Sequence, residues 1–278
     1  HEVLVVSAED LLAANEAGSH DLDGVLDQAF GADGLGIICV AGGEEFQARV
    51  REIRGGLLPM ALELERLPDA AKEAIAERGT VNISNYSRGI DGHRSGFYFH
   101  PATDTPGDGL PDSVELDPNF YTPNLWPDEA LPELRPRGRS AARFLVDLGQ
   151  QFARALDRRC RAAFDGYGAG ALEGLLRRPE DCNHKCRLIC YHDYDTDEQR
   201  AGHKGMWAPP HKDTGLLTAL VPGVFLGSGD GARLAACPDP EVGLYIRDRR
   251  GAIAQVSVPA GTGECVFFQI GEALQIVS

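Results

Sequence analysis

The C-terminal half of the chain constrains the fold most, because its pattern is that of short strands. After Cys186, apolar runs of strand length alternate with turns rich in Gly, Pro and Asp, most clearly at Gly251 and Gly261–Gly263. Strands at this spacing, after a more helical half, predict an α+β chain with a β-sandwich or jelly-roll core and packing helices. The expected strands are Arg187–Tyr191, Leu216–Pro222, Gly243–Arg247, Ile253–Val258 and Cys265–Ile270.

The N-terminal half is predicted to be mostly helical. A short strand at Val3–Val6 precedes a capping-box pattern, and a helix that ends near Gly31 precedes a buried strand at Leu35–Val40. Phe46 to Gly79 follows as helices broken by proline. The clearest helix runs from Ser140 to Phe164, where apolar residues recur every three or four positions.

Between Thr80 and Pro136 the periodicity is lost and Gly, Pro, Asp and Asn are frequent. A segment so long and irregular is predicted to be functional or a lid, with a solvent-exposed insertion as the alternative. We place a boundary here, with an N-terminal helical and irregular region at 1–136 and the jelly-roll catalytic core at 137–278.

Charge and composition narrow the range of possible binding partners and of cellular compartments. The 278 residues carry a net charge of −15, which disfavours nucleic acid and anionic membranes. No apolar run reaches membrane-spanning length, so we expect a cytoplasmic protein. The chain starts with His1 rather than Met, which leaves open a preceding organellar targeting peptide. Seven cysteines without a CxxC pair predict reduced, structural thiols. The oligomeric state is not readable.

His211-Lys212-Asp213 carries the chemistry. A His and a carboxylate two residues apart point to the same side of an extended segment, and here they precede an expected strand. Imidazole plus carboxylate with open positions suits non-haem Fe(II). Taken alone, the pair fits a surface salt bridge or a strand-end cap better than a metal site.

The flanking segments favour the interpretation of the pair as metal ligands. In order and spacing they resemble the isopenicillin-N-synthase-like branch of the Fe(II)- and 2-oxoglutarate-dependent dioxygenases. The segments that carry the resemblance are Asp23–Phe30 with Gly34–Ile38, Asn124-Leu-Trp-Pro-Asp128, Gly243–Arg247, Val256–Pro259 and Phe268–Ile276. The resemblance covers nearly the whole chain.

The resemblance implies a double-stranded β-helix that binds Fe(II) through two His and one Asp. His211 and Asp213 match the first two ligands, and Tyr191 matches a position whose phenol often reaches the 2-oxoglutarate carboxylate. It also implies that O2 and 2-oxoglutarate are consumed while a small organic molecule is hydroxylated or desaturated. The substrate is not readable. Five residues of the aromatic-rich segment are candidates for its pocket, with packing as the alternative: Tyr86, Arg88, Phe97, Tyr98 and His100.

The chain departs from the family at its end. No His follows His211, so the distal His and the co-substrate Arg of the family have no counterpart. We therefore expect a fragment that lacks its last strands, or a family member that has lost its chemistry. The other hypotheses are a same-fold oxidase that uses no 2-oxoglutarate, a non-catalytic jelly-roll interaction protein, and a cupin-like metal protein. His203 is a possible substitute ligand, although an exposed loop His is the preferred interpretation.

Overall fold

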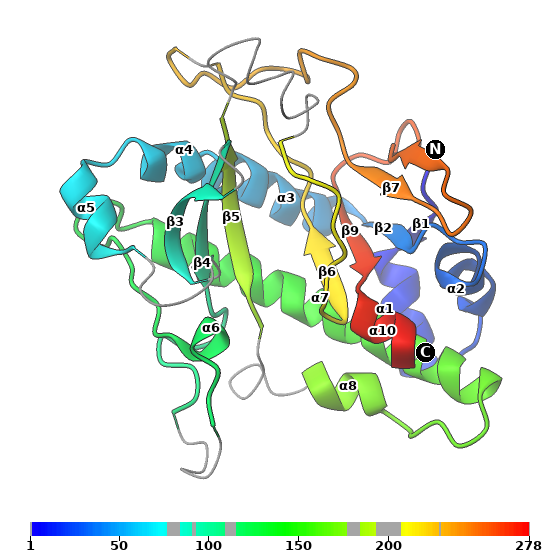
Figure 1. The fold of residues 1–278 in the computed structure, drawn as a ribbon. Helices are drawn as coiled ribbons and strands as arrows, with labels where there is room; N and C mark the ends of the chain where they lie inside the picture. The colour runs from blue at the N-terminus through cyan, green and yellow to red at the C-terminus, as the bar shows by residue number, and fades with distance from the viewer. Residues whose placement is uncertain are drawn as a thin grey trace.

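Two β-sheets and a long helix organise the molecule (Figure 1). The structure is a computed structural model that describes residues 2–76, 84–90, 93–108, 115–176, 184–192, 207–227 and 229–277. The strands are β1 Val5–Ser7, β2 Ile37–Ala41, β3 Asn85–Ile90, β4 Arg94–Phe99, β5 Cys186–Tyr191, β6 Leu217–Leu220, β7 Tyr245–Arg247, β8 Ile253–Gln255 and β9 Cys265–Ile270. The helices are α1 Ala8–Ala17, α2 Asp23–Phe30, α3 Glu44–Glu52, the π-helix η1 Ile53–Leu57, α4 Met60–Glu65, α5 Asp69–Ala74, α6 Pro118–Tyr121, α7 Leu134–Ala163, α8 Ala171–Leu176 and α10 Glu272–Val277.

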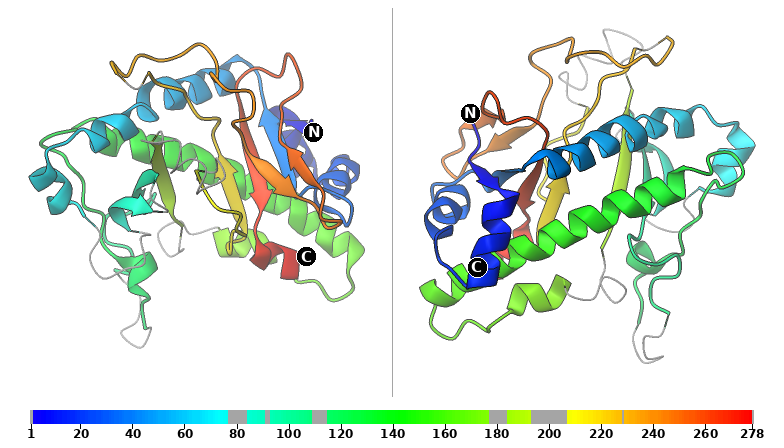
Figure 2. Two further views of the ribbon diagram at one scale, coloured as in Figure 1. Left: turned by 45° about the horizontal axis from the view of Figure 1, so that its top comes forward. Right: turned by 180° about the vertical axis from the view of Figure 1, so that it is seen from behind.

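The larger sheet joins the two ends of the chain. Its order is β1-β2-β9-β6, with β1 parallel to β2 and the other pairs antiparallel. The second sheet has the order β3-β4-β5, and β7 pairs with β8 as a separate ribbon. The three views place β5 beside β6, so the two sheets lie edge to edge (Figure 2).

Helix α7 crosses behind both sheets and carries the core (Figure 2). Its Phe152 is fully buried and stacks on Phe268 of β9, with ring centroids 4.9 Å apart. Towards its start, Leu134 and Ala141 pack in a second cluster with residues of β4 and β5. One amphipathic helix thus fixes both sheets, since the faces they turn to it are apolar.

Most of the predicted elements are confirmed. All five C-terminal strands form, some shorter than expected. Ser7 caps α1 and accepts a hydrogen bond from the Asp10 amide, 3.0 Å. Pro59 and Pro68 stand immediately before α4 and α5, where proline fits a helix start. Mixed sheets and helices make the chain α+β, as predicted.

Two expectations were wrong. The stretch from Thr80 to Pro136 is not irregular throughout, because it holds β3 and β4. Every residue of β4 is buried, so the alternation of polar and apolar residues that identifies a half-exposed strand is missing. The long helix begins at Leu134 rather than Ser140, since Pro136 lies in the first turn, where proline costs no hydrogen bond.

The 136/137 boundary falls inside α7, and β2 from the first region pairs with β9 from the second. The boundary stays a prediction. In the described part of the chain, no helix is both long enough and apolar enough to cross a membrane.

Candidate functional site

His211 and Asp213 lie together in the segment that leads into β6. His211 Nε2 is 3.6 Å from Asp213 Oδ1. On the other side of the ring, Nδ1 is 2.9 Å from the Pro209 carbonyl oxygen. A carbonyl only accepts, so Nδ1 carries the proton, and Nε2 is the ring nitrogen that faces the carboxylate. That tautomer is the one a metal ligand needs.

The second carboxylate oxygen of Asp213 is also held. Thr218 of β6 donates a hydrogen bond from Oγ1 to Asp213 Oδ2 over 2.6 Å. Thr218 pairs in register with Gln269 of β9, which fixes its position. Because one oxygen is engaged by the hydroxyl, the other is oriented towards His211. Residues that orient a ligand in this way are as much part of a metal site as the ligand.

The end of β9 fixes the backbone of the same loop. The Glu272 amide donates to the Asp213 carbonyl over 2.7 Å, and Lys212 Nζ lies 2.8 Å from Glu272 Oε1. Gly271 runs so close to the loop that a Cβ there would lie 2.0 Å from the Gly215 carbonyl oxygen. The start of α10 therefore holds the His211–Asp213 segment against the larger sheet.

The donor set fits a metal ion in part. Two ligands each about 2.1 Å from one ion can stand up to about 4.2 Å apart, so the separation of 3.6 Å allows a shared ion. The side chains are 52% and 27% exposed, which leaves the position between them open to other ligands. No group of three or more His, Cys, Asp or Glu that could hold a metal occurs within the described ranges. His203 lies outside those ranges.

Tyr191 ends β5 and is half-exposed. Its ring is tilted against that of Trp207, with centroids 6.0 Å apart, and Trp207 begins the segment that carries His211. The candidate co-substrate residue thus contacts the ligand loop through an aromatic pair. Whether it binds 2-oxoglutarate stays a prediction.

Four of the five candidate pocket residues divide between the two faces of the smaller sheet, and the fifth, His100, follows β4. Paired residues of neighbouring antiparallel strands share a face, and successive residues alternate. Tyr98 pairs with Arg187, an even number of residues before Tyr191, so Tyr98 shares the face of Tyr191. Tyr86 and Phe97 are paired with each other on the opposite face, which packs against helices.

Two of these residues have polar partners that explain their placement. Tyr86 donates to Glu65 over 2.7 Å, and burial together with that carboxylate raises the pKa of Tyr86. Arg88 Nε lies 3.3 Å from Glu65 Oε1. Tyr86 and Arg88 therefore attach β3 to Glu65 at the end of α4. Their role in a substrate pocket stays a prediction, as does that of Phe97, Tyr98 and His100.

The Asn124-Leu-Trp126 motif holds the loop after β4. The Asn124 side chain accepts from the His100 amide over 2.7 Å and donates to the carbonyls of His100 and Thr103, 3.0 Å each. His100 is fully buried, and its Nδ1 accepts from the Thr103 amide. This motif was predicted from a resemblance, and here it organises the loop that His100 begins.

Asp104 closes the same network. Burial alone would raise its pKa, but hydrogen bonds from Trp126, Arg139 and Asn124 lower it below its ordinary value. The Trp126 Nε1 to Asp104 Oδ1 distance is 2.6 Å, and Arg139 Nη2 lies 2.7 Å from the same oxygen. The ionised carboxylate thus connects the loop to α7.

Comparison with known proteins identifies the fold. No family model matches the chain, and no curated protein matches it. Solved structures do match: the chain shares its fold with proteins solved with 2-oxoglutarate, one of them a dioxygenase, which supports the resemblance at the level of the fold but does not single out the isopenicillin-N-synthase-like branch.

Two proteins represent these neighbours. One is a full-length protein from Neurospora crassa, solved in complex with alpha-KG, at a TM-score of 0.61 and 16% identity over 98% of this chain and 74% of that one. The same protein was also solved with alpha-KG and thymine (TM-score 0.59, 14% identity). The other is the Arabidopsis thaliana dioxygenase for auxin oxidation 1 with 2-oxoglutarate, at a TM-score of 0.57 and 14% identity over 99% of this chain and 81% of that one.

Proposed function

We propose that this protein is a non-haem Fe(II)- and 2-oxoglutarate-dependent oxygenase that hydroxylates or desaturates a small organic molecule. The supporting observation is the His211–Asp213 pair, in which each side chain is oriented by a hydrogen bond on the side away from the other. The fold supports the assignment, since both the Neurospora crassa protein and the auxin dioxygenase were solved with 2-oxoglutarate. We also propose that the two main sheets belong to a double-stranded β-helix.

Each residue has a defined part in this proposal. The iron, once bound, would supply O2 activation coupled to 2-oxoglutarate decarboxylation. His211 would donate its Nε2 lone pair and Asp213 its Oδ1, while Pro209 and Thr218 keep the tautomer and the carboxylate orientation. Tyr191 would contact the co-substrate. The third protein ligand is not among the described residues, and we assign it to none of them.

An ion pair is the competing interpretation of the same geometry, because a doubly protonated imidazole would also sit 3.6 Å from a carboxylate. It belongs to the hypothesis of a non-catalytic interaction protein. The two hypotheses differ in one property: only the first requires the pair to bind a divalent metal.

Anaerobic equilibrium dialysis with Fe(II), carried out on the protein expressed from its complete open reading frame, tests the proposal. We expect the wild-type chain to retain iron, and His211→Ala and Asp213→Ala to lose it, each by at least tenfold in affinity, since each removes one ligand. Lys212→Ala is the matched control, because Lys212 lies between the ligands and its ion pair with Glu272 is exposed, so that the pair contributes little to the position of the loop. Equal iron binding by wild type and both ligand variants would contradict the metal site and favour the ion pair.

A further inference from the structure

Cys39 and Cys265 form a buried pair of thiols across two strands of the larger sheet. Cys39 lies on β2 opposite Phe267, and Cys265 lies on β9 opposite Ala41. Paired residues share a face of the sheet, so the two cysteines are diagonal neighbours on one face. They are 0% and 2% exposed, and neither is in a disulfide.

The two thiols contact each other directly. A side-chain hydrogen bond joins them, and it raises the pKa of Cys39 while it lowers the pKa of Cys265. The physical reason is that the S–H of Cys39 donates to the Cys265 sulfur, which stabilises a thiolate there. Cys265 is therefore the more reactive of the two, because the thiolate is the nucleophile.

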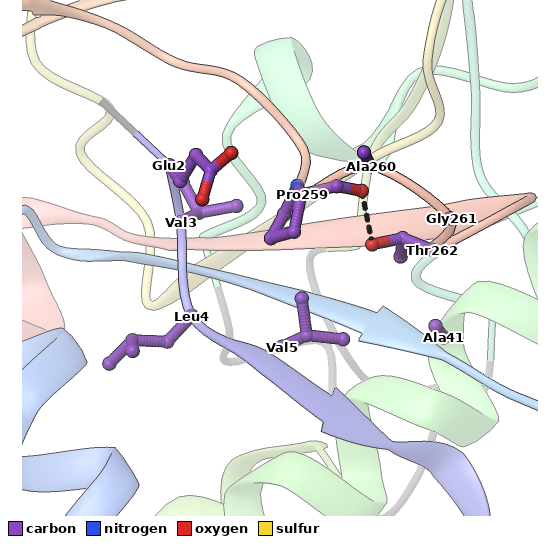
Figure 3. A pocket seen from close by; sticks show the side chains of 9 residues that line it. All are labelled: Glu2, Val3, Leu4, Val5, Ala41, Pro259, Ala260, Gly261 and Thr262. Atoms are coloured by element: carbon purple, nitrogen blue, oxygen red, sulfur yellow. Dashed lines mark hydrogen bonds between the residues drawn. The ribbon is translucent and has the colours of Figure 1, made fainter.

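A surface depression lies over the same side of the sheet. It has a volume of about 600 Å³ and is lined by residues of β1 and its lead-in, by Ala41 and by the turn before β9 (Figure 3). Val3 lines it and packs in the same apolar cluster as both cysteines, while Ala41 is the residue paired with Cys265. The depression is therefore bounded by residues that adjoin the apolar cluster in which both thiols are buried.

We propose that Cys39 and Cys265 form a reversible disulfide when the protein meets a hydroperoxide. The Cys265 thiolate attacks one peroxide oxygen, the O–O bond breaks, and the leaving oxygen takes up a proton to become water. Cys39 then attacks the sulfur of the resulting sulfenic acid, and the expelled hydroxyl takes the Cys39 proton as a second water. Two thiols are oxidised by two electrons, and one hydrogen peroxide is reduced to two waters.

The register predicts that this disulfide is easily reduced. Diagonal neighbours in an antiparallel pair have Cα atoms about 7–8 Å apart, at or beyond the upper limit of what a disulfide spans. Because β2 and β9 are already hydrogen-bonded neighbours, closing the bond must distort their backbones, and a strained disulfide is the more oxidising kind. Because β9 ends at the residues that hold the Asp213 backbone, the shift also reaches the His211–Asp213 loop.

Peptide mapping of the whole chain tests the proposal. The protein is treated with hydrogen peroxide, its remaining thiols are alkylated, and the non-reduced digest is analysed by mass spectrometry. We expect a cross-linked pair of peptides that contain Cys39 and Cys265, lighter by two hydrogens and separated by dithiothreitol. Cys265→Ser should leave Cys39 reduced, whereas Cys39→Ser should leave a Cys265 sulfenic acid that dimedone traps.

Cys160→Ser provides the matched control, because Cys160 is also buried but lies on α7, and this variant should still form the disulfide. The proposal is overturned if both thiols of the wild-type chain remain alkylatable at peroxide concentrations that oxidise the half-buried Cys237. Joining of either cysteine to a different partner also overturns it. The wild-type map decides the matter even if a serine variant fails to fold.

Discussion

Replacing Thr218 by valine tests whether the Asp213 carboxylate is oriented for a ligand role. The substitution keeps the branched shape in β6 but removes the hydroxyl that donates to Asp213 Oδ2 over 2.6 Å. A hydrogen bond to a charged acceptor contributes about 1.5–3 kcal/mol when buried. Asp213 is 27% exposed, so solvent screening reduces the expected loss to about 1–2 kcal/mol.

The expected consequence is weaker metal binding. A loss of about 1–2 kcal/mol corresponds to a decrease of about 5- to 30-fold in the Fe(II) affinity of the chain. Anaerobic titration with Fe(II) measures it, and Thr218→Ser, which restores the hydroxyl, should recover most of the affinity. Binding by Thr218→Val within twofold of wild type would refute the argument that Thr218 orients a metal ligand.

Three further variants test the packing and electrostatics around the site. Phe152→Ala should lower the free energy of unfolding in urea by about 3–5 kcal/mol, because Phe152 is fully buried and stacked on Phe268; a loss below about 1 kcal/mol would contradict the core assignment. Asp157→Ala should cost about 3 kcal/mol in the same assay, since it strands the buried amides of Leu172 and Glu173 at the start of α8. For Asp104, whose pKa is lowered in the folded state, the stability contribution is present above its unfolded value of 3.8 and lost as pH falls through the lower folded value. Asp104→Asn should flatten acid unfolding in that range, and an unchanged pH profile would count against the network.

The sequence pattern was sufficient for the segment with the clearest periodicity and chemistry. His211 and Asp213 were predicted to share one side of an extended segment before a strand, and they do lie 3.6 Å apart before β6. Nothing in the sequence pattern identifies Thr218 as a partner of Asp213. Its contact with Asp213 depends on how the loop folds back, which local pattern does not specify.

Burial on both faces explains the missed strands. Asn85–Ser87 of β3 and all of β4 are covered on either side, so polar and apolar residues do not alternate, and Arg94 and Ser95 are buried along with Phe97. The division of Tyr86 and Tyr98 between two faces depends on register, which the sequence does not show.

The pairing of β2 with β9 could not be predicted from the local sequence pattern either. Cys39 and Cys265 meet because β9 is inserted beside β2, a connection between the two ends of the chain. Seven cysteines without a CxxC pair predicted reduced structural thiols, and the six in the described segments are free. What local pattern could not predict is that two of these thiols contact each other.

Conversion of 2-oxoglutarate tests the central claim most directly. The protein, expressed from its complete open reading frame, is incubated with Fe(II), O2 and 2-oxoglutarate, and succinate is quantified against a metal-free sample and against Asp213→Ala. We predict iron-dependent succinate formation by the wild-type protein that falls by at least tenfold in Asp213→Ala and persists in Lys212→Ala. Succinate formation that is the same in wild type and Asp213→Ala, or absent from the iron-loaded wild-type protein, would contradict the assignment.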